Sequence, residues 1–255
     1  MIKKKPLFAS IKTRRAFEKV SEQIKELIFS GVFKPGDRLL SERELASQFG
    51  VARIVVREAL RVLEQSGFIL IRQGSEGGAF VKEIGASVVT QSFSDMMRLG
   101  KIGFGHLTEA RLGIEKITLA FVVVRADEKD LALLKENVQQ SENVLLTGKR
   151  ATEANVSFHV LLAKASKNPL LGMIQESISR IVYTLLQSLK TDVEYSTRVV
   201  QYHKDIYRAV CDRNEALAAK LMEEHIQDVT RKLSELSEAE KPKRERRHPG
   251  GIGPV

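Results

Sequence analysis

Residues 50–71 read GVARIVVREALRVLEQSGFILI and combine the pattern of a buried helix with a row of arginines. A helix is predicted over 53–65 and a strand from 68 onward. The apolar positions of that helix share one face: Val56, Ala59, Leu60 and Leu63. Arg53, Arg57 and Arg61 form a second stripe on the adjoining face. The helix is therefore expected to pack on a core with one side and to present cations on the other.

The residues before this helix predict a second helix joined tightly to it. SERELASQFG, residues 41–50, begins with a capping box, in which Ser41 caps the helix and Glu44 follows three residues later. The helix ends at Gly50, and the next begins near Ala52. So short a connection is typical of a helix-turn-helix, whose second helix reads the major groove of DNA. The arginine stripe is therefore interpreted as a DNA-contacting surface, with a merely solvated charged face as the alternative.

The flanking segments extend this motif to a winged helix. Downstream, FILIR (68–72) and AFVKE (79–83) read as two strands around the glycine-rich tip QGSEGG (73–78), which predicts a β-hairpin. Upstream, a helix is predicted at about 14–30, and GVFKPGDRL (31–39) reads as a turn fixed by its glycine and proline residues.

The rest of the chain carries helical patterns without strand signals. The expected helices span about 86–99, 106–125, 127–147, 150–167, 170–189, 192–212 and 215–236. The fold class is thus mainly α: a winged helix-turn-helix with a small β-hairpin wing, followed by an all-α bundle of about seven helices. We expect a basic arm at 1–10, a DNA-binding domain at 11–84, a helical effector-binding and dimerisation domain at 85–237, and a disordered basic tail at 238–255.

Charge is unevenly distributed along the 255 residues, whose formal net charge is +9. Residues 1–84 hold 16 Lys and Arg against 10 Asp and Glu, whereas 85–240 hold 20 against 21. A basic N-terminal third fits a polyanionic partner. The lack of a long apolar run predicts no membrane partner, the N-terminus does not read as a signal peptide, and a single cysteine excludes an internal disulfide framework. We therefore expect a cytoplasmic protein.

Three of the five histidines lie on three different predicted helices of the second domain: His159, His203 and His225. Asn155 precedes His159 by four residues and shares its helix face. Imidazoles that converge from several helices are a common way to build a metal site inside a bundle. Scattered histidines are also ordinary polar residues, and the spacing alone leaves both interpretations open.

The N-terminal segment resembles the GntR-type bacterial transcription regulators. PGDRLLSERELASQFGVARIVVREALRVLEQSGFI, residues 35–69, follows the pattern of that family almost throughout. The resemblance implies DNA contacts from these residues: Arg43, Arg53, Arg57 and, at the wing tip, Gln73 and Gly74. Where the family commonly has hydroxyl residues around the first recognition arginine, this sequence has Ala52, Ile54 and Val55. Ile54 is expected to touch a thymine methyl instead.

Residues 86–236 resemble the all-helical FCD effector domain of the FadR branch of that family. The segments that carry the pattern are TEARLGIE, NVSFHVLLAKASKNPLL, YHKDIYRAV and ALAAKLMEEHI. Many such domains bind a divalent metal through one carboxylate and three histidines, next to an organic acid. The resemblance implies a site of His159, His203 and His225, with Asn155 at the position of the usual aspartate. Zn is the expected metal, with Ni or Mn as alternatives. Arg111 matches an arginine that grips the effector carboxylate, whereas its alternative role is a surface pair with Glu115.

Two functions of different classes follow. The leading hypothesis is a homodimeric, ligand-responsive transcription regulator, a repressor that a small organic acid releases from a palindromic DNA operator. The alternative is a helical metalloenzyme, hydrolase-like, that uses the histidines to activate water and the winged helix for DNA targeting. Such an enzyme needs an acid/base carboxylate beside its ligands, and Glu224, adjacent to His225, is the obvious candidate.

Overall fold

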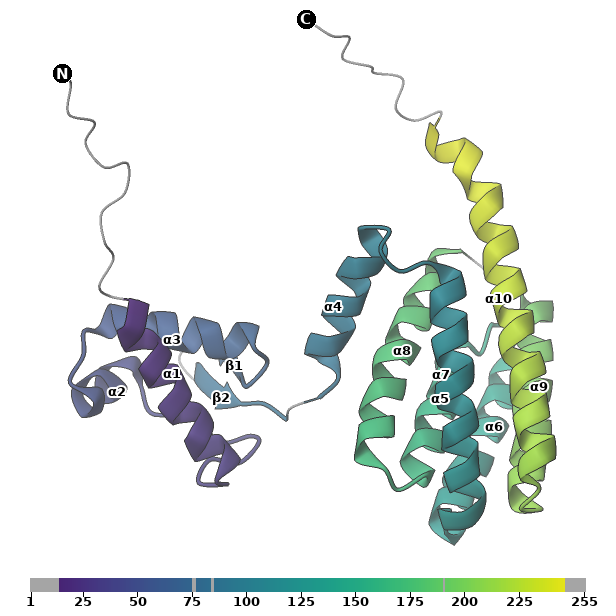
Figure 1. The fold of residues 1–255 in the computed structure, drawn as a ribbon, viewed down its shortest axis with the longest axis horizontal. Coiled ribbons are helices and arrows are strands. Elements are labelled where there is room, and N and C mark those ends of the chain that lie inside the picture. The colour runs from purple at the N-terminus through teal and green to yellow at the C-terminus, as the bar shows by residue number, and fades with distance from the viewer. Residues whose placement is uncertain (1–13, 75–76, 84, 190, 246–255) are drawn as a thin grey trace, which may run out of the picture. The chain divides into compact units, whose positions relative to one another are not determined.

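The computed structural model describes residues 14–74, 77–83, 85–189 and 191–245. The chain divides into two compact units, Met1–Val88 and Val89–Val255, close to the boundary expected after residue 84 (Figure 1). The expected basic arm, 1–10, lies outside the described residues, as does the end of the tail from 246.

The N-terminal unit is a winged helix, and its elements match those predicted. It contains α1 (Arg14–Phe29), α2 (Glu42–Phe49), α3 (Arg53–Gln65), β1 (Ile69–Arg72) and β2 (Gly78–Val81). The capping box of α2 is formed, since Ser41 Oγ accepts from the Glu44 N–H and the Glu44 carboxylate accepts from the Ser41 N–H. Gly50 ends α2 with a φ of 62°, a left-handed conformation that glycine adopts without strain.

The core of this unit lies under α3. The four predicted apolar positions of α3 are all buried. They pack with residues from α1, α2 and both strands: Val20, Ile24, Leu45, Ala46, Ile69, Ala79 and Val81. β1 and β2 pair antiparallel, with Ile69 opposite Val81 and Arg72 opposite Gly78. The predicted turn at 31–39 ends by joining this sheet, because Leu39 N donates to Ala79 O and Val81 N donates to Asp37 O.

The seven helices labelled α4 to α10 in the described residues follow, as expected, and α5 to α10 pack together as a bundle. The seven helices span Ser87–Arg98, Phe104–Arg125, Glu128–Leu146, Thr152–Ala165, Pro169–Ser188, Val193–Cys211 and Glu215–Glu245. Asp127, Asn168 and Asp192 cap α6, α8 and α9 with their side chains. None of the helices in the described part of the chain combines the length and apolar character that a bilayer crossing needs.

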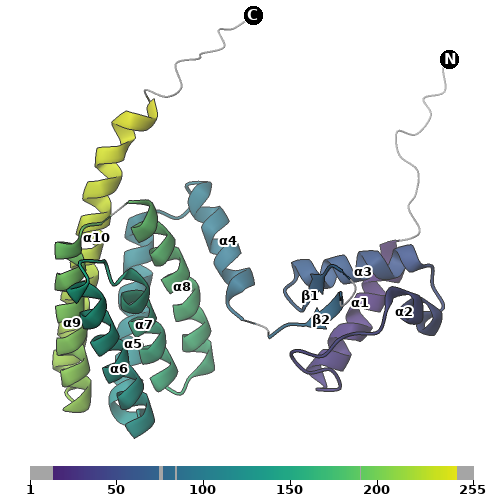
Figure 2. The ribbon, with the colours of Figure 1, turned by 180° about the vertical axis from the view of Figure 1, so that it is seen from behind.

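Helix α7 occupies the middle of the bundle and positions the second site. It packs against α5, α6, α8 and α9, while α10 packs against α5 and α9 (Figures 1 and 2). The main core cluster forms around Leu119, Leu134, Phe158, Ile206 and Met222, which come from five different helices. A polar side chain on the inner face of α7 is therefore surrounded by helices and shielded from water.

The end of α10 corrects one expectation. The sequence predicted a helix to about 236 and a disordered tail from 238, but α10 continues to Glu245. Six of the nine added residues are Glu, Lys or Arg, which have good helix propensity, whereas Pro242 among them opposes the helix. Polarity alone was therefore an insufficient reason to end the helix.

Candidate functional site

The first candidate site is the exposed face of α2, α3 and the hairpin. Arg43 on α2 is exposed, as are Arg53, Ile54 and Arg57 on α3 and Gln73 and Gly74 at the end of β1. Ile54 is 59% exposed, which is high for a side chain of its size and apolar character. The structure thus leaves every predicted DNA-contacting residue accessible while the opposite face of α3 is buried.

Glu42 holds the recognition arginines, a feature that sequence reasoning missed. Its carboxylate accepts two hydrogen bonds from Arg57, at 3.1 Å from Nε and 2.9 Å from Nη2, and lies 3.7 Å from Arg53. The bonds from Arg57 are the main reason that the pKa of Glu42 is lowered. Glu42 and Arg57 are 15 positions apart on two helices, so no spacing rule within one helix could have linked them. The two hydrogen bonds of this ion pair hold the Arg57 fork in one direction.

Two further arginines of the N-terminal unit, Arg61 and Arg72, have partners of their own. Arg61 pairs with Glu58 at 2.8 Å, the pairing that the helical spacing allowed. Arg72 lies on the Phe80 ring, with its guanidinium carbon 4.5 Å from the ring centre, and so holds a positive charge on the wing. Ala52 caps α3 without a side-chain hydrogen bond, as expected for a residue that lacks a hydroxyl.

The second candidate site is a buried cluster of the three predicted histidines. His159, His203 and His225 are 2%, 1% and 1% exposed, and their potential ligand atoms all lie within 4.8 Å of one another. His225 Nε2 lies 3.1 Å from His159 Nε2 and 3.3 Å from His203 Nε2. Burial lowers the pKa of all three imidazoles, and those of His203 and His225 fall well below the ordinary value. All three are therefore neutral at pH 7, which is the form that binds metals.

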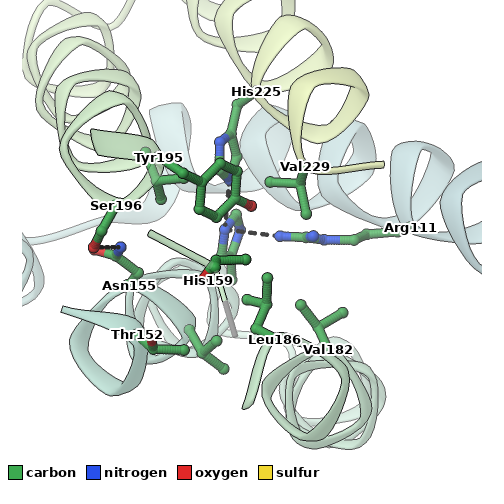
Figure 3. A pocket seen from close by; sticks show the side chains of 13 residues that line it. Arg111, Thr152, Asn155, His159, Val182, Leu186, Tyr195, Ser196, His225 and Val229 are labelled. Atoms are coloured by element: carbon green, nitrogen blue, oxygen red, sulfur yellow. Dashed lines mark hydrogen bonds between the residues drawn. The ribbon is translucent and has the colours of Figure 1, made fainter. Parts of the chain in front are cut away.

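The cluster fits a divalent metal ion. Two nitrogens bound at about 2.0–2.1 Å to a tetrahedral zinc lie about 3.3 Å apart, close to the two Nε2 separations found here. Asn155, one helical turn before His159, lines the same cavity, and its Oδ1 has no hydrogen-bond partner among the described residues. Its Nδ2 faces Ser196 Oγ at 3.4 Å, which orients the amide (Figure 3). The three imidazoles are nitrogen donors of the kind that zinc takes, and the Asn155 amide oxygen lines the same cavity.

Glu115 supports the cluster from outside and was missed as a site residue. Its Oε1 lies 2.7 Å from His159 Nδ1 and accepts a hydrogen bond from Gln175 Nε2 at 2.9 Å. Burial disfavours the charged form, but His159 and Arg111 outweigh it and lower the pKa of this carboxyl. A carboxylate on Nδ1 is the usual partner of a metal-binding histidine, because it turns Nε2 toward the metal. The sequence offered Glu115 only as the i+4 neighbour of Arg111.

Arg111 points inward from α5 to the histidines rather than to the surface. It is 5% exposed, and its Nη2 lies 2.8 Å from His159 Nε2, while its Nε lies 3.4 Å from Glu115 Oε1. Figure 3 shows the guanidinium entering the cavity beside His159. The contact with Glu115 that we weighed as a surface pair is real, but it is buried. It anchors the arginine and leaves part of its fork directed at the cavity.

The cavity beside the histidines leaves about 20 Å³ open to a water-sized molecule. Apolar side chains cover one side: Val156, Val182, Leu186, Val199 and Val229. Tyr195 also lines it and is 3% exposed, yet its hydroxyl has no hydrogen-bond partner among the described residues. Burial raises the pKa of this phenol, so the hydroxyl stays protonated and able to donate.

Other titratable candidates lie away from the cluster. Glu224, the proposed acid/base of an enzyme, is exposed, and the nearest cation is Lys220 at 3.9 Å. His106 is exposed at the start of α5, and His248 lies outside the described residues.

Comparison with known proteins places both units in one family. The model for bacterial regulatory proteins of the gntR family matches residues 16–81, and the FCD domain model matches 106–228. The Uxu operon transcriptional regulator of Escherichia coli (strain K12) is 30% identical over 232 residues, covering 88% of this chain and 89% of that protein. The HTH-type transcriptional regulator LutR of Bacillus subtilis (strain 168) is 30% identical over 216 residues, covering 82% and 96%.

A solved structure agrees with these sequence relatives. The GntR protein of Streptococcus agalactiae aligns with a TM-score of 0.66 at 25% identity, covering 84% of this chain and 99% of that one. All these matches are to regulators, which removes the metalloenzyme alternative. The chain therefore belongs to the gntR family of bacterial regulatory proteins and is a DNA-binding transcription regulator with an FCD effector domain.

Proposed function

We propose that this regulator is a homodimeric repressor in the cytoplasm, of the FadR branch, that binds a palindromic operator and is released from it by a small organic acid. The observation that carries the proposal is the convergence of Arg111 and three neutral histidine nitrogens at one buried cavity. Cations and hydrogen-bond donors gathered in a water-poor cavity favour an anionic ligand. A carboxylate is the anion that a guanidinium fork binds best at this size.

The histidines and Asn155 would hold the divalent metal, for which zinc is the first expectation. When bound, the metal supplies a positive charge that attracts a carboxylate. Glu115 keeps the His159 ring in its orientation through the 2.7 Å contact with Nδ1. Since Asn155 carries no charge where the family resemblance implies aspartate, the site would keep a larger positive charge, which would strengthen its preference for an anion.

Arg111 would link metal and effector. Its contact with His159 Nε2 uses the lone pair that would hold a metal, so this part of the guanidinium would be free for another partner if the histidines held one. The freed N–H groups can then donate to the effector carboxylate. A ligand changes DNA affinity only if it binds one arrangement of the domains better than another. We infer that the acid favours the arrangement that does not fit the operator.

The DNA-binding unit would use Arg53 and Arg57 for bases or phosphates, with Arg43, Ile54, Gln73 and Gly74 as further contacts. An arginine fork that Glu42 already orients is suited to the bidentate contact that guanine offers in the major groove. Two such units in a two-fold dimer would read two symmetric half-sites, and the FCD domain would supply dimer contacts.

The test combines elemental analysis with footprinting on an operator obtained by selection from random DNA. Wild-type protein should retain about one divalent metal per chain and protect two symmetric half-sites. His203→Ala should lose the metal but keep its ligand-free operator affinity, while His106→Ala, the exposed control, should keep both. A monomer on one asymmetric half-site would contradict the dimer. Equal metal content in wild type and His203→Ala would contradict the histidine site.

A further inference from the structure

We propose that Tyr195 reads the effector together with Arg111, and that the effector is a short aliphatic carboxylate rather than a polyhydroxylated sugar acid. This inference rests on the proposed function, because it assumes that an acid binds beside the histidines. It adds a specificity-determining residue and narrows the class of ligand.

Tyr195 has the features of a ligand-contacting residue. It lies in the first turn of α9, directly after the loop held by the N-cap Asp192, whose carboxylate accepts from the Tyr195 N–H at 2.6 Å. This bond fixes the backbone, so the ring enters the cavity from a defined point. Figure 3 shows the hydroxyl directed into the cavity, on the side where the Arg111 guanidinium enters. No described residue hydrogen-bonds with that hydroxyl, although the ring is almost fully buried.

A buried hydroxyl without a partner is costly, so its position demands a ligand group that accepts a hydrogen bond. The guanidinium of Arg111 cannot accept the hydrogen bond that this hydroxyl has to donate, because it is itself only a donor. A carboxylate oxygen can accept from both the phenol and the guanidinium. Tyr195 and Arg111 thus form a pair of donors for one anion, one of them neutral and one charged.

The apolar side chains of the cavity determine what kind of group the ligand can carry beyond its carboxylate. Val182 and Leu186 from α8 and Val229 from α10 face the space next to Tyr195 and Arg111 (Figure 3). These side chains offer no hydrogen bonds. A sugar acid carries a hydroxyl on nearly every carbon, and each one left unpaired against this wall would weaken binding on the order of tenfold. An aliphatic chain of a few carbons meets no such cost and gains contact area.

The polar groups on the other side, which also include Thr152, offset this only in part. Ser196 Oγ already accepts from the Ala151 N–H at 2.9 Å and faces Asn155 Nδ2, and Thr191 Oγ1 accepts from Arg150 at 3.3 Å, so these hydroxyls have their own O–H groups left to donate but little capacity to accept. Asn155 Oδ1 remains, but it is the oxygen that the proposed metal site uses. The cavity leaves only about 20 Å³ open to a water-sized molecule, so a small acid displaces fewer of the lining side chains than a larger one does.

Titration calorimetry on full-length, zinc-loaded protein without DNA tests the inference with four probes: propionate, butyrate, D-gluconate and D-glucuronate. Wild type should bind butyrate at least tenfold more tightly than either sugar acid. Tyr195→Phe, which keeps the ring and removes the hydroxyl, should weaken butyrate about tenfold and leave zinc content unchanged. Tyr183→Phe is the matched control, since Tyr183 lines a separate surface groove, and should bind like wild type.

A second variant tests the role of the apolar side chains that line the cavity. Val182→Thr adds a hydroxyl at almost constant volume and should improve the affinity for D-gluconate relative to butyrate. Preference of wild type for a sugar acid would overturn the ligand class, and equal butyrate affinity in Tyr195→Phe would overturn the role of Tyr195. If wild type binds none of the four acids, the proposal that the effector is a carboxylate is refuted, and this inference is refuted as well.

Discussion

Replacing Glu42 by glutamine should lower the specificity of DNA binding while raising the affinity for nonspecific DNA. The carboxylate lies 2.9 Å from Arg57 Nη2 and 3.7 Å from Arg53, so the variant frees both arginines and removes a negative charge from the DNA-facing surface. Exposed ion pairs are worth about 0.2–1 kcal/mol, so nonspecific affinity should rise at most about fivefold. The loss of one anion should also steepen the dependence of log K on log salt by about 0.9.

In this variant the affinity for the operator should rise less than the affinity for nonspecific DNA, because the Arg57 fork loses its fixed direction. Immobilising a long side chain on binding costs about 0.5–1.5 kcal/mol, and this cost is avoided only where the side chain is already held. The ratio of specific to nonspecific affinity should therefore fall about two- to tenfold.

Fluorescence anisotropy on the selected operator and on a scrambled duplex, at several salt concentrations, measures that ratio. Glu58→Gln is the matched control, because Glu58 pairs with Arg61 on the same helix at 2.8 Å, away from the proposed base contacts. A ratio that stays constant or rises in Glu42→Gln, or that falls equally in Glu58→Gln, would refute the positioning role of Glu42.

Further predictions concern the DNA contacts, the metal and acid stability. Arg57→Ala should cost roughly 1–3 kcal/mol of operator affinity in the same assay and Arg61→Ala distinctly less, whereas equal losses would contradict the assignment of base contacts. Glu115→Gln should weaken zinc about 10- to 100-fold in a competition with a chelating dye, and unchanged affinity would remove its role beside His159. The hydrogen bond from the Asp130 N–H, with Lys167, lowers the pKa of Asp127 from its ordinary 3.8 to about 2. This carboxylate therefore stabilises the fold above pH 3.8 and loses that effect as the pH falls toward 2. The free energy of unfolding in urea should therefore vary less with pH over this range in Asp127→Asn than in wild type.

Local patterns were sufficient for the fold. The apolar stripe of α3, the capping box at Ser41 and the glycine at 50 depend on neighbours within a few positions, and the sequence states them directly. The helices of the second unit follow from the same periodicity and from caps such as Asp127. The predicted end of α10 was wrong, because a polar composition was taken as a sign of disorder.

The site was predictable only in part. The structure brings the three histidines and Arg111 together, as the resemblance implied. Glu42 and Glu115 could not be found, because their roles depend on how helices cross: 15 positions separate Glu42 from Arg57, and Glu115 meets His159 from another helix. Nothing in the local sequence marks Tyr195 either, since its lack of a partner is a property of the packed bundle.

The central claim is that an acid held by Arg111 beside the histidines controls operator binding. The most direct test is the operator affinity of zinc-loaded protein with and without butyrate, compared between wild type and Arg111→Lys. The lysine keeps a positive charge beside Glu115 but lacks the guanidinium fork. Wild type should lose operator affinity by roughly 5- to 150-fold with butyrate, whereas Arg111→Lys should retain its zinc and ligand-free affinity and respond little. An equal response in both proteins would contradict the account.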